Sequence, residues 1–255
     1  MKLSLHGKKG LVVGIANDRS IAFGCAQAFR EAGAELAVTY LNDKARPYTE
    51  PLSAALGAEL FLPCDVREEG QVEALFAALA ERWGKLEFLL HSIAFAPRED
   101  LHGRVTDCSR EGFDMAMNVS CHSFIRMARH AEPLMKDGGA LMTMSYYGAE
   151  KVVDRYNLMG PVKAALEASV RYLAVELGPK NIRVYAVSPG PLKTRAASGI
   201  DRFDELMDQA AARAPNHALV TIEQVGDVAA FLASEAAAGM TGNVVYVDNG
   251  YNVVG

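Results

Sequence analysis

The hydrophobic positions of this chain change their period from segment to segment. Residues 11–13, Leu-Val-Val, form a short apolar run between Lys-Lys-Gly and Gly14, which is typical of a buried parallel strand that enters a glycine turn. From Ser20 onward, apolar residues recur every fourth position until Gly33. This second pattern predicts an amphipathic helix that ends at the glycine.

Strand and helix patterns continue to alternate along the rest of the chain. Further strands are predicted at residues 35–40, 59–63, 88–91, 140–144, 183–187 and 244–247. Long helical patterns separate most of them, for example at 71–83, 156–177 and 222–233. A capping box precedes the last of these helices, with Thr221 followed three residues later by Gln224.

This order of elements predicts right-handed β-α-β units and therefore an α/β fold. We expect one Rossmann domain over residues 1–255, a doubly wound parallel sheet of about seven strands with helices on both faces. No internal repeat, linker or low-complexity tract marks a second domain. Residues 192–216, which follow a strand end and are rich in alanine, charges and turn residues, are expected to form a mobile cover over the substrate.

The composition argues against several classes of partner. A net charge of −5 leaves no basic footprint for nucleic acid. The first residues contain no signal-peptide pattern and no apolar run approaches a membrane span, so we expect a cytoplasmic protein with no membrane partner. Scattered histidines and the lack of a C-x-x-C pair predict no metal site and four buried free thiols, at Cys25, Cys64, Cys108 and Cys121.

The candidate chemistry lies in residues 145–167, directly after an apolar strand-like run. Tyr156 and Lys163 are seven residues apart, and two helical turns of about 3.6 residues each would return both side chains to one face. The Lys163 ammonium can hold a cofactor ribose and lower the proton affinity of nearby oxyanions, and the Tyr156 hydroxyl can donate to a developing negative charge. Tyr146 precedes both. The alternative is an ordinary tyrosine and lysine on an amphipathic helix.

Residues 14–24 form a predicted strand-turn-helix junction, where backbone amides and the helix dipole favour a pyrophosphate. Their sequence is not the generic G-x-G-x-x-G fingerprint. The alternative is a plain helix start in which Ser20 serves only as the N-cap.

The end of the second strand bears on the choice of nucleotide. Residues 40–43 contain no arginine or lysine that could pair a 2′-phosphate, which favours NAD(H) over NADP(H). Lys44 and Arg46 follow closely and are interpreted as surface cations. Asp65, after the third strand, is placed either to accept from an adenine amino group or to cap a helix.

These segments together resemble the enoyl-acyl-carrier-protein reductases of bacterial fatty-acid synthesis, a divergent branch of the short-chain dehydrogenase/reductase superfamily. The resemblance covers essentially the whole chain, and the stretches that carry it are residues 14–24, 91–97, 145–150, 156–163 and 190–200. Ordinary short-chain dehydrogenases carry Tyr-x-x-x-Lys, whereas here Gly160 stands four residues after Tyr156 and the lysine comes later. This longer spacing separates the enoyl reductases from ketoreductases.

The resemblance implies hydride transfer from NADH to the β-carbon of a trans-2-enoyl thioester borne by acyl carrier protein or CoA. Tyr156 would hydrogen-bond to the enolate, Lys163 would hold the nicotinamide ribose, and Tyr146 would shape the acyl pocket, with Ala96 as a further substrate contact. A homotetramer packed through helices such as 156–177 is also implied. The implied NADH contacts are Gly14, Ser20, Ile21, Leu41, Asp65, Val66, Ile93, Lys163, Leu192, Lys193, Thr194, Arg195 and Ala196.

Three features depart from the family pattern. Leu41 replaces a polar residue at the adenine ribose, and Tyr185 stands where the superfamily usually carries asparagine. Residues 201–205 read Asp-Arg-Phe-Asp-Glu, where relatives often place basic residues that grip the acidic carrier. Three explanations stay open. The carrier docks elsewhere, through Lys193, Arg195 or Arg202, or the thioester is borne by a group other than the usual carrier. In the third, the acidic residues of this segment arose by neutral drift and have no bearing on the carrier.

Two other functions fit the same fold. A short-chain dehydrogenase that reduces a carbonyl or an enone in a specialised pathway would be favoured by Tyr-x-x-x-Lys, which is absent. A non-catalytic NAD-sensing protein would be expected to lose the tyrosine and lysine, and both are present.

Overall fold

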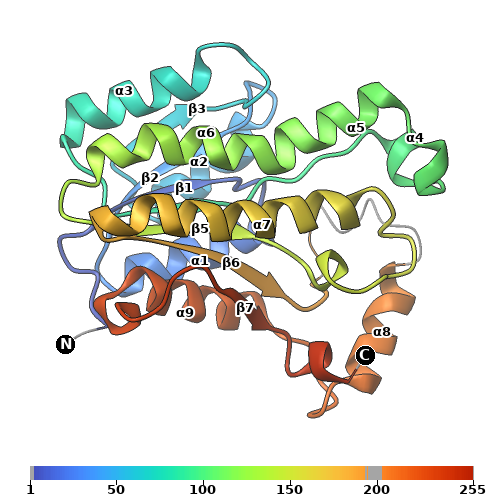
Figure 1. Cartoon of the computed structure of the whole chain (residues 1–255). Helices are drawn as coiled ribbons and strands as arrows, with labels where there is room; N and C mark the ends of the chain where they lie inside the picture. Colours follow the sequence, from blue (N-terminus) through green and yellow to red (C-terminus); the bar gives the residue numbers. More distant parts are fainter. Residues whose placement is uncertain (1–2, 193, 195–202, 255) are drawn as a thin grey trace.

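Seven parallel strands form the sheet at the centre of the molecule (Figure 1). The computed structural model describes residues 3–192, 194 and 203–254. The strand order is β3-β2-β1-β4-β5-β6-β7, the doubly wound order of a Rossmann fold. The strands are β1 (Lys9–Val13), β2 (Glu35–Tyr40), β3 (Leu60–Pro63), β4 (Phe88–His91), β5 (Gly139–Met144), β6 (Ile182–Pro189) and β7 (Val244–Val247).

Helices connect the strands and cover both faces of the sheet (Figure 1). The α-helices are α1 (Ile21–Glu31), α2 (Arg46–Ala55), α3 (Gln71–Trp83), α4 (Arg98–Leu101), α5 (Arg110–Met117), α6 (Ser123–Ala131), α7 (Met159–Leu177), α8 (Phe203–Arg213) and α9 (Ile222–Ala233). A π-helical turn, Asn118–His122, joins α5 to α6. Short 3₁₀ turns lie at Val105–Asp107, Glu132–Leu134, Tyr147–Ala149, Gly178–Lys180, Glu235–Ala237 and Tyr251–Val253.

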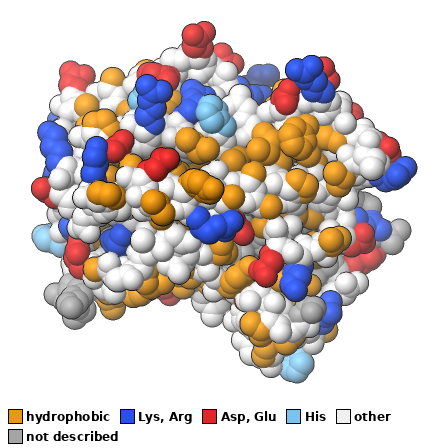
Figure 2. All heavy atoms as spheres, in the orientation of Figure 1, with side chains coloured by type: hydrophobic (Ala, Val, Ile, Leu, Met, Phe, Trp, Pro, Cys, Tyr) orange, Lys and Arg blue, Asp and Glu red, His pale blue; other side chains and the backbone are white. Residues whose placement is uncertain are grey.

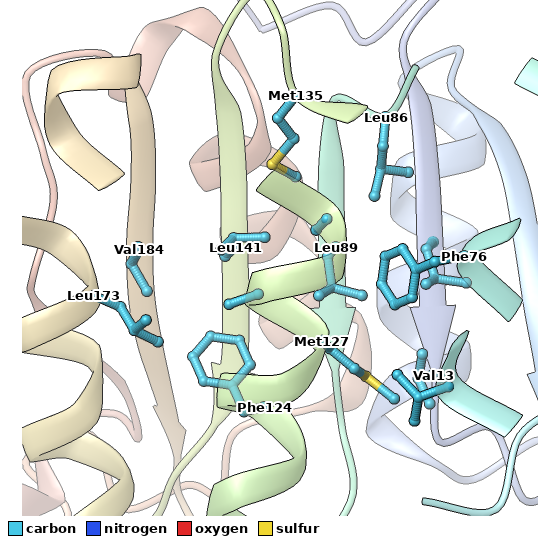
Figure 3. Packing of buried hydrophobic residues seen from close by; sticks show 14 of the residues in the cluster. Val13, Phe76, Leu86, Leu89, Phe124, Met127, Met135, Leu141, Leu173 and Val184 are labelled. Atoms are coloured by element: carbon cyan, nitrogen blue, oxygen red, sulfur yellow. The ribbon is translucent and has the colours of Figure 1, made fainter. Parts of the chain in front are cut away.

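The sheet separates two hydrophobic cores. On one face, α3, α6 and α7 pack against side chains such as Leu89 and Leu141, and Figure 3 shows Phe76, Phe124 and Leu173 spread across this face of the sheet. On the other face, α1 and α9 pack against the remaining side chains of the same strands. Because both faces are buried, the strands are apolar along their length instead of alternating with polar residues.

A crevice is expected where the strand order reverses, between the carboxyl ends of β1 and β4. Gly14 directly follows β1 there with φ +110°, a conformation that favours glycine. A Cβ at this position would overlap the carbonyl oxygen of Ser92, which follows β4. The glycine therefore lets the two strand ends approach, and it leaves the crevice free of side-chain atoms at that point.

Most of the predicted elements are confirmed. The strands at 35–40, 88–91 and 244–247 and the helices at 71–83 and 222–233 have the predicted bounds. The capping box is formed, since Thr221 Oγ1 accepts from the Gln224 backbone at 3.3 Å and Gln224 Oε1 accepts from the Thr221 backbone at 2.9 Å. The other predicted strands differ from β1, β3, β5 and β6 only at their ends.

The prediction of a helix from residue 156 is wrong, because α7 begins at Met159. Arg155 and Asn157, on either side of Tyr156, have φ of +64° and +42°, which no right-handed helix contains. Pro161 gives the physical reason. Its missing N–H is harmless in the first turn of α7, whereas in a helix from 156 it would break an interior hydrogen bond.

Two further expectations change with the structure. All four cysteines are free, but Cys108 is only half-buried because it lies in the loop before α5. Residues 192–216 contain α8, and the rest of the expected cover includes residues 195–202, which lie outside the described residues, so its mobility stays a prediction.

Tyr185 has a structural role. Its ring is fully buried on β6, and its hydroxyl donates to the carbonyl of Met240 at 2.7 Å. Arg183 Nη1 donates to that hydroxyl and to the carbonyl of Ser234, each at 3.1 Å. This network ties the end of α9 and the turn after it to the sheet.

Candidate active site

Lys163 lies on α7 with its ammonium buried against the carboxyl end of β5. The side chain is 4% exposed, and Nζ donates to the carbonyl of Met144 at 2.6 Å. Burial lowers the pKa of Lys163 to about 8, although the Glu167 carboxylate on the same helix acts in the opposite direction. Lys163 is therefore positively charged near neutral pH. Because it is buried, its charge needs a nearby negative group, such as a carboxylate or a bound ligand.

Tyr146 and Tyr156 form a packed pair. Their ring centroids are 4.8 Å apart with the planes at 63°, an edge-to-face contact. Tyr156 is buried and Tyr146 is half-buried. The Tyr146 hydroxyl oxygen is nonetheless inaccessible and has no hydrogen-bond partner among the described residues. A buried hydroxyl without a hydrogen bond destabilises the folded protein, so the Tyr146 hydroxyl is expected to hydrogen-bond to a bound ligand.

Gly148 fixes the position of Tyr156. A Cβ on Gly148 would overlap Cδ1 of the Tyr156 ring and would lie 2.8 Å from its Cε1. The ring therefore rests on the backbone of the short turn Tyr147–Ala149. Burial raises the pKa of both Tyr146 and Tyr156 well above the ordinary value, so both hydroxyls are protonated and able to donate at neutral pH.

Apolar side chains surround this tyrosine pair. Leu158, Met159, Val162 and Ala116 form a buried cluster with Tyr156. Ala96, Tyr146 and the half-buried Cys108 pack against its edge, in the region where Figure 1 draws α4 and α5 beside the start of α7. The surroundings suit an acyl chain. Sequence analysis identified Ala96 and both tyrosines, and the structure brings all three together.

The amino terminus of α1 follows Gly14 and is free of capping side chains. Ser20 occupies the N-cap position, but its hydroxyl donates to the carbonyl of Asn17 at 2.6 Å and does not cap the helix. The interpretation of Ser20 as a simple N-cap is therefore wrong. No acidic residue lies in the first turn, which begins with Ile21, so the amides and the helix dipole can accept an anion.

The end of β2 and the loop after β3 lie at the same carboxyl edge of the sheet as Gly14, since β1, β2 and β3 are parallel neighbours. Leu41 is 48% exposed, which leaves an apolar surface where a ribose would lie. Arg46 pairs with Glu50 at 3.1 Å and lies over the Tyr40 ring, so its guanidinium is already engaged.

Asp65 is buried, and Val66 beside it is buried as well. The Asp65 carboxylate accepts from the Arg67 guanidinium at 2.6 Å and from the Arg67 backbone at 3.0 Å, and this pairing lowers the pKa of Asp65. It does not cap α3, whose N-cap is Gly70, so that alternative is wrong. An adenine amino group would have to share the carboxylate with Arg67.

The remaining predicted cofactor contacts are only partly described. Ile93 is partly buried and packs on the core beside α3, while Leu192 packs on the opposite core and Thr194 is half-buried. Lys193, Arg195 and Ala196 lie outside the described residues. Their contacts with a cofactor stay predictions.

Sequence reasoning assigned no role to one buried pair. Ser145 Oγ donates to Oε1 of Glu167 at 2.5 Å, and both residues are buried. Glu167 lies four residues after Lys163 on α7, a spacing that places both side chains on one face of a helix. That spacing was visible in the sequence, whereas the contact with Ser145 depends on how α7 packs against β5.

Two classes of site find no support within the described part of the chain. No group of three or more histidine, cysteine, aspartate or glutamate side chains is arranged there to hold a metal ion. None of the helices described combines the length and the apolar character that a membrane crossing requires.

The chain is similar to a large set of known reductases. The family described as Enoyl-(Acyl carrier protein) reductase matches residues 14–252. An NADH-dependent enoyl-acyl-carrier-protein reductase of Rhizobium meliloti is 49% identical over 251 residues, which cover 98% of this chain and 92% of the relative. The corresponding enzyme of Escherichia coli is 46% identical over 250 residues, covering 98% and 95% of the two chains.

Solved structures agree with this relationship. The reductase of Anaplasma phagocytophilum in complex with NAD superposes with a TM-score of 0.95 at 47% identity and covers 98% of this chain and 96% of its own. The Bacillus cereus reductase with NADP+ and an indole naphthyridinone gives a TM-score of 0.96 at 43% identity, over 100% of both chains. The chain therefore belongs to the enoyl-acyl-carrier-protein reductase family.

Proposed function

We propose that this chain is an NADH-dependent oxidoreductase that reduces trans-2-enoyl thioesters to saturated acyl thioesters in fatty acid biosynthesis. One observation carries the proposal. The unpartnered, buried hydroxyl of Tyr146 lies in a packed tyrosine pair at the same strand end where Lys163 is held by Met144. This arrangement combines hydroxyl donors, a cation and an apolar pocket, which a reduction of a conjugated thioester requires.

The residues at the crevice fit a dinucleotide. Gly14 has no room for a side chain, and the first turn of α1 after Ser20 offers uncapped amides for a pyrophosphate. Residues 40–43 at the end of β2 contain no cation for a 2′-phosphate, and Arg46 further on is engaged by Glu50, which supports NADH; Lys44 is the exposed cation that remains in this loop. The proposed contacts are Gly14, Ser20, Ile21, Leu41, Asp65, Val66, Ile93, Lys163, Leu192, Lys193, Thr194, Arg195 and Ala196.

The catalytic roles follow from the chemistry of each side chain. Bound NADH supplies the hydride that reduces the β-carbon of the substrate. Tyr156 donates to the thioester oxygen as negative charge develops there, and Lys163 holds the ribose hydroxyls with its ammonium. Tyr146 and Ala96 line the acyl pocket. The rest of the apolar cluster excludes water from the reacting atoms.

Acyl carrier protein is the carrier that we propose for the acyl group, with CoA as the alternative. Glu205 and Asp208 are exposed on α8, so the first turns of the described helix are acidic, and its exposed basic residue is Arg213 in the last turn. Lys193, Arg195 and Arg202, which lie outside the described residues, remain the predicted docking cations. A cytoplasmic location and a homotetramer are proposed with the same function.

The test is an assay of purified protein with NADH or NADPH and three substrates: a trans-2-enoyl thioester on acyl carrier protein, the same acyl group on CoA, and a 3-oxoacyl thioester. The proposal predicts turnover of the enoyl substrates with NADH. Turnover of the oxoacyl compound alone would identify a ketoreductase, and tight NADH binding without turnover of any substrate would identify a sensor.

A further inference from the structure

Two consecutive residues at the end of β5 are tied to α7 by two side chains one helical turn apart. The carbonyl of Met144 accepts from Lys163 at 2.6 Å, and the hydroxyl of Ser145 donates to Glu167 at 2.5 Å. Tyr146, whose ring contacts Tyr156, comes next in the chain. The position of that ring therefore depends on both links.

The second link is buried. Ser145 is 5% exposed and Glu167 is 8% exposed. The Ser145 backbone is also held, since its N–H donates to the carbonyl of Val187 on β6 at 2.7 Å. A buried carboxylate is expensive unless it is paired, so a charged residue in this place calls for an explanation beyond packing.

We propose that Glu167 is a positioning residue for the reaction: its carboxylate holds Ser145, and thereby Tyr146, against α7, and its negative charge keeps the Lys163 ammonium protonated. The inference rests on the proposed function, because it concerns how Lys163 and Tyr146 are made ready for cofactor and substrate.

The groups around Lys163 leave Glu167 as its source of negative charge. From β4, His91 faces Lys163, and its burial lowers the pKa of the imidazole to about 3, so it is neutral. From the π-helical turn, Cys121 would oppose the effect of burial on Lys163 more strongly than Glu167 does if it were a thiolate. Burial raises the pKa of this thiol, however, so it is neutral near pH 7. Only Glu167, on α7 itself, adds a carboxylate among the described groups that act on Lys163.

Glu167 has charged neighbours of its own. Burial raises its pKa, while the Ser145 hydroxyl, Arg171 and Lys163 lower it and Glu150 raises it. Glu150 in turn accepts from the Tyr246 hydroxyl at 2.7 Å. The net pKa of Glu167 is raised, because burial outweighs the donor and the two cations. The geometry favours the carboxylate form that the proposal requires, since 2.5 Å between Ser145 Oγ and Glu167 Oε1 is the short distance of a hydroxyl that donates to a charged carboxylate.

Three variants separate the two roles of Glu167. Glu167→Gln keeps the shape and an acceptor for Ser145 but removes the charge. Ser145→Ala removes the hydroxyl and keeps the carboxylate. Glu167→Asp keeps the charge but shortens the side chain. Glu81→Gln on α3, at an exposed position far from β5 in the chain, is the matched control for loss of one negative charge.

The first readout is the NADH dissociation constant as a function of pH. In wild type we expect affinity to fall above the pKa of Lys163, about 8. In Glu167→Gln the fall is expected to begin about one pH unit lower, the smaller end of the effect of an adjacent charge. Ser145→Ala, Glu167→Asp and Glu81→Gln should keep the wild-type midpoint. An unchanged midpoint in Glu167→Gln would overturn the charge role.

The second readout is steady-state kinetics with the enoyl thioester. Ser145→Ala and Glu167→Asp should raise KM for the thioester several-fold with NADH affinity unchanged, because the placement of Tyr146 is loosened. Wild-type KM in both would overturn the positioning role. If the wild-type protein itself reduces no enoyl thioester, the proposed function fails, whereas the NADH titrations still test the role of the Glu167 charge.

Discussion

At the residue scale, the roles proposed for Lys163 and Tyr156 can be separated by mutation. Lys163→Ala removes the only ammonium held at the end of β5 in the described structure, and we expect NADH affinity to fall by roughly tenfold to a hundredfold. Tyr156→Phe removes one donor to the developing charge, and we expect kcat to fall on the order of 10²-fold with NADH affinity intact. Fluorescence titration and steady-state kinetics measure both. Wild-type NADH affinity in Lys163→Ala would refute the role given to the lysine.

The pKa of Lys163 makes a second residue-scale prediction. Burial lowers it to about 8, so the ammonium is present below that pH and is lost as the pH rises through it. NADH affinity should therefore be constant from about pH 6 to 7.5 and decline above about pH 8. Lys163→Ala should remove this decline. An affinity that is flat to pH 9.5 in wild type would contradict the prediction.

Residue types and their spacing identified the side chains that we propose for the chemistry, but only part of how they are arranged. Tyr146, Tyr156, Lys163 and Ala96 were identified from the sequence. The link from Ser145 to Glu167 was not, because its partners are 22 residues apart and meet only after α7 packs on β5. The pairing of Asp65 with Arg67 was also missed. An aspartate just after a strand is common both in short loops and at helix N-caps, so its position in the sequence does not show which partner it has.

At the element scale, the short turn Tyr147–Ala149 supports the tyrosine pair. Gly148→Ala would place a Cβ that overlaps Cδ1 at the edge of the Tyr156 ring, so the ring must shift. A displacement of a catalytic group by about an ångström can cost on the order of 10²-fold in rate. We expect kcat to fall by this order while NADH affinity is preserved.

Gly178→Ala is the matched control, because a Cβ at Gly178 would meet no atom within 4 Å and its φ is −54°. Kinetics and thermal unfolding of both variants provide the measurement. Equal kcat in the two variants would show that the turn does not set the position of Tyr156.

The bounds of helices and strands could be predicted where the sequence carried one clear local signal. The capping box at Thr221 and the buried apolar runs gave correct bounds for α9 and several strands. The start of α7 was misjudged, because the seven-residue spacing of Tyr156 and Lys163 suggested a continuous helix although Pro161 favours a later start. The left-handed residues Arg155 and Asn157 left no clear signal in the sequence.

At the scale of the whole molecule, the outer face of α7 is unusually apolar. Tyr172 and Val175 are 74% and 79% exposed, and Phe113 and Met115 on α5 are exposed as well. Figure 2 shows hydrophobic side chains gathered on the face where Figure 1 draws α5, α6 and α7. Such patches mark protein contacts more often than free surface.

The proposed homotetramer would cover this face. Wild type should have four times the 27.5 kDa mass of one chain by light scattering, and Tyr172→Glu with Val175→Glu should give smaller species. Tyr48→Glu on α2, also at an exposed tyrosine, should keep the wild-type mass. A tetramer in the double variant would place the interface elsewhere, and a monomeric wild type would refute the assembly.

The overall architecture was predictable because alternating strands and helices admit few arrangements, and the observed strand order is the one expected for a doubly wound sheet. The group that carries the acyl chain of the substrate could not be predicted from the sequence. It depends on surface charge around residues 193–208, where acidic side chains such as Glu205 give no indication of a partner.

The central claim is that hydride passes from NADH to the β-carbon of an enoyl thioester. Its most direct test is single-turnover reduction of a trans-2-enoyl thioester on acyl carrier protein with NADH that carries deuterium at both C4 positions, followed by mass spectrometry of the acyl product. We predict a saturated product with one deuterium at C3 and a solvent-derived hydrogen at C2. Deuterium at another carbon, or recovery of unreduced substrate while a 3-oxoacyl thioester is reduced, would contradict the account.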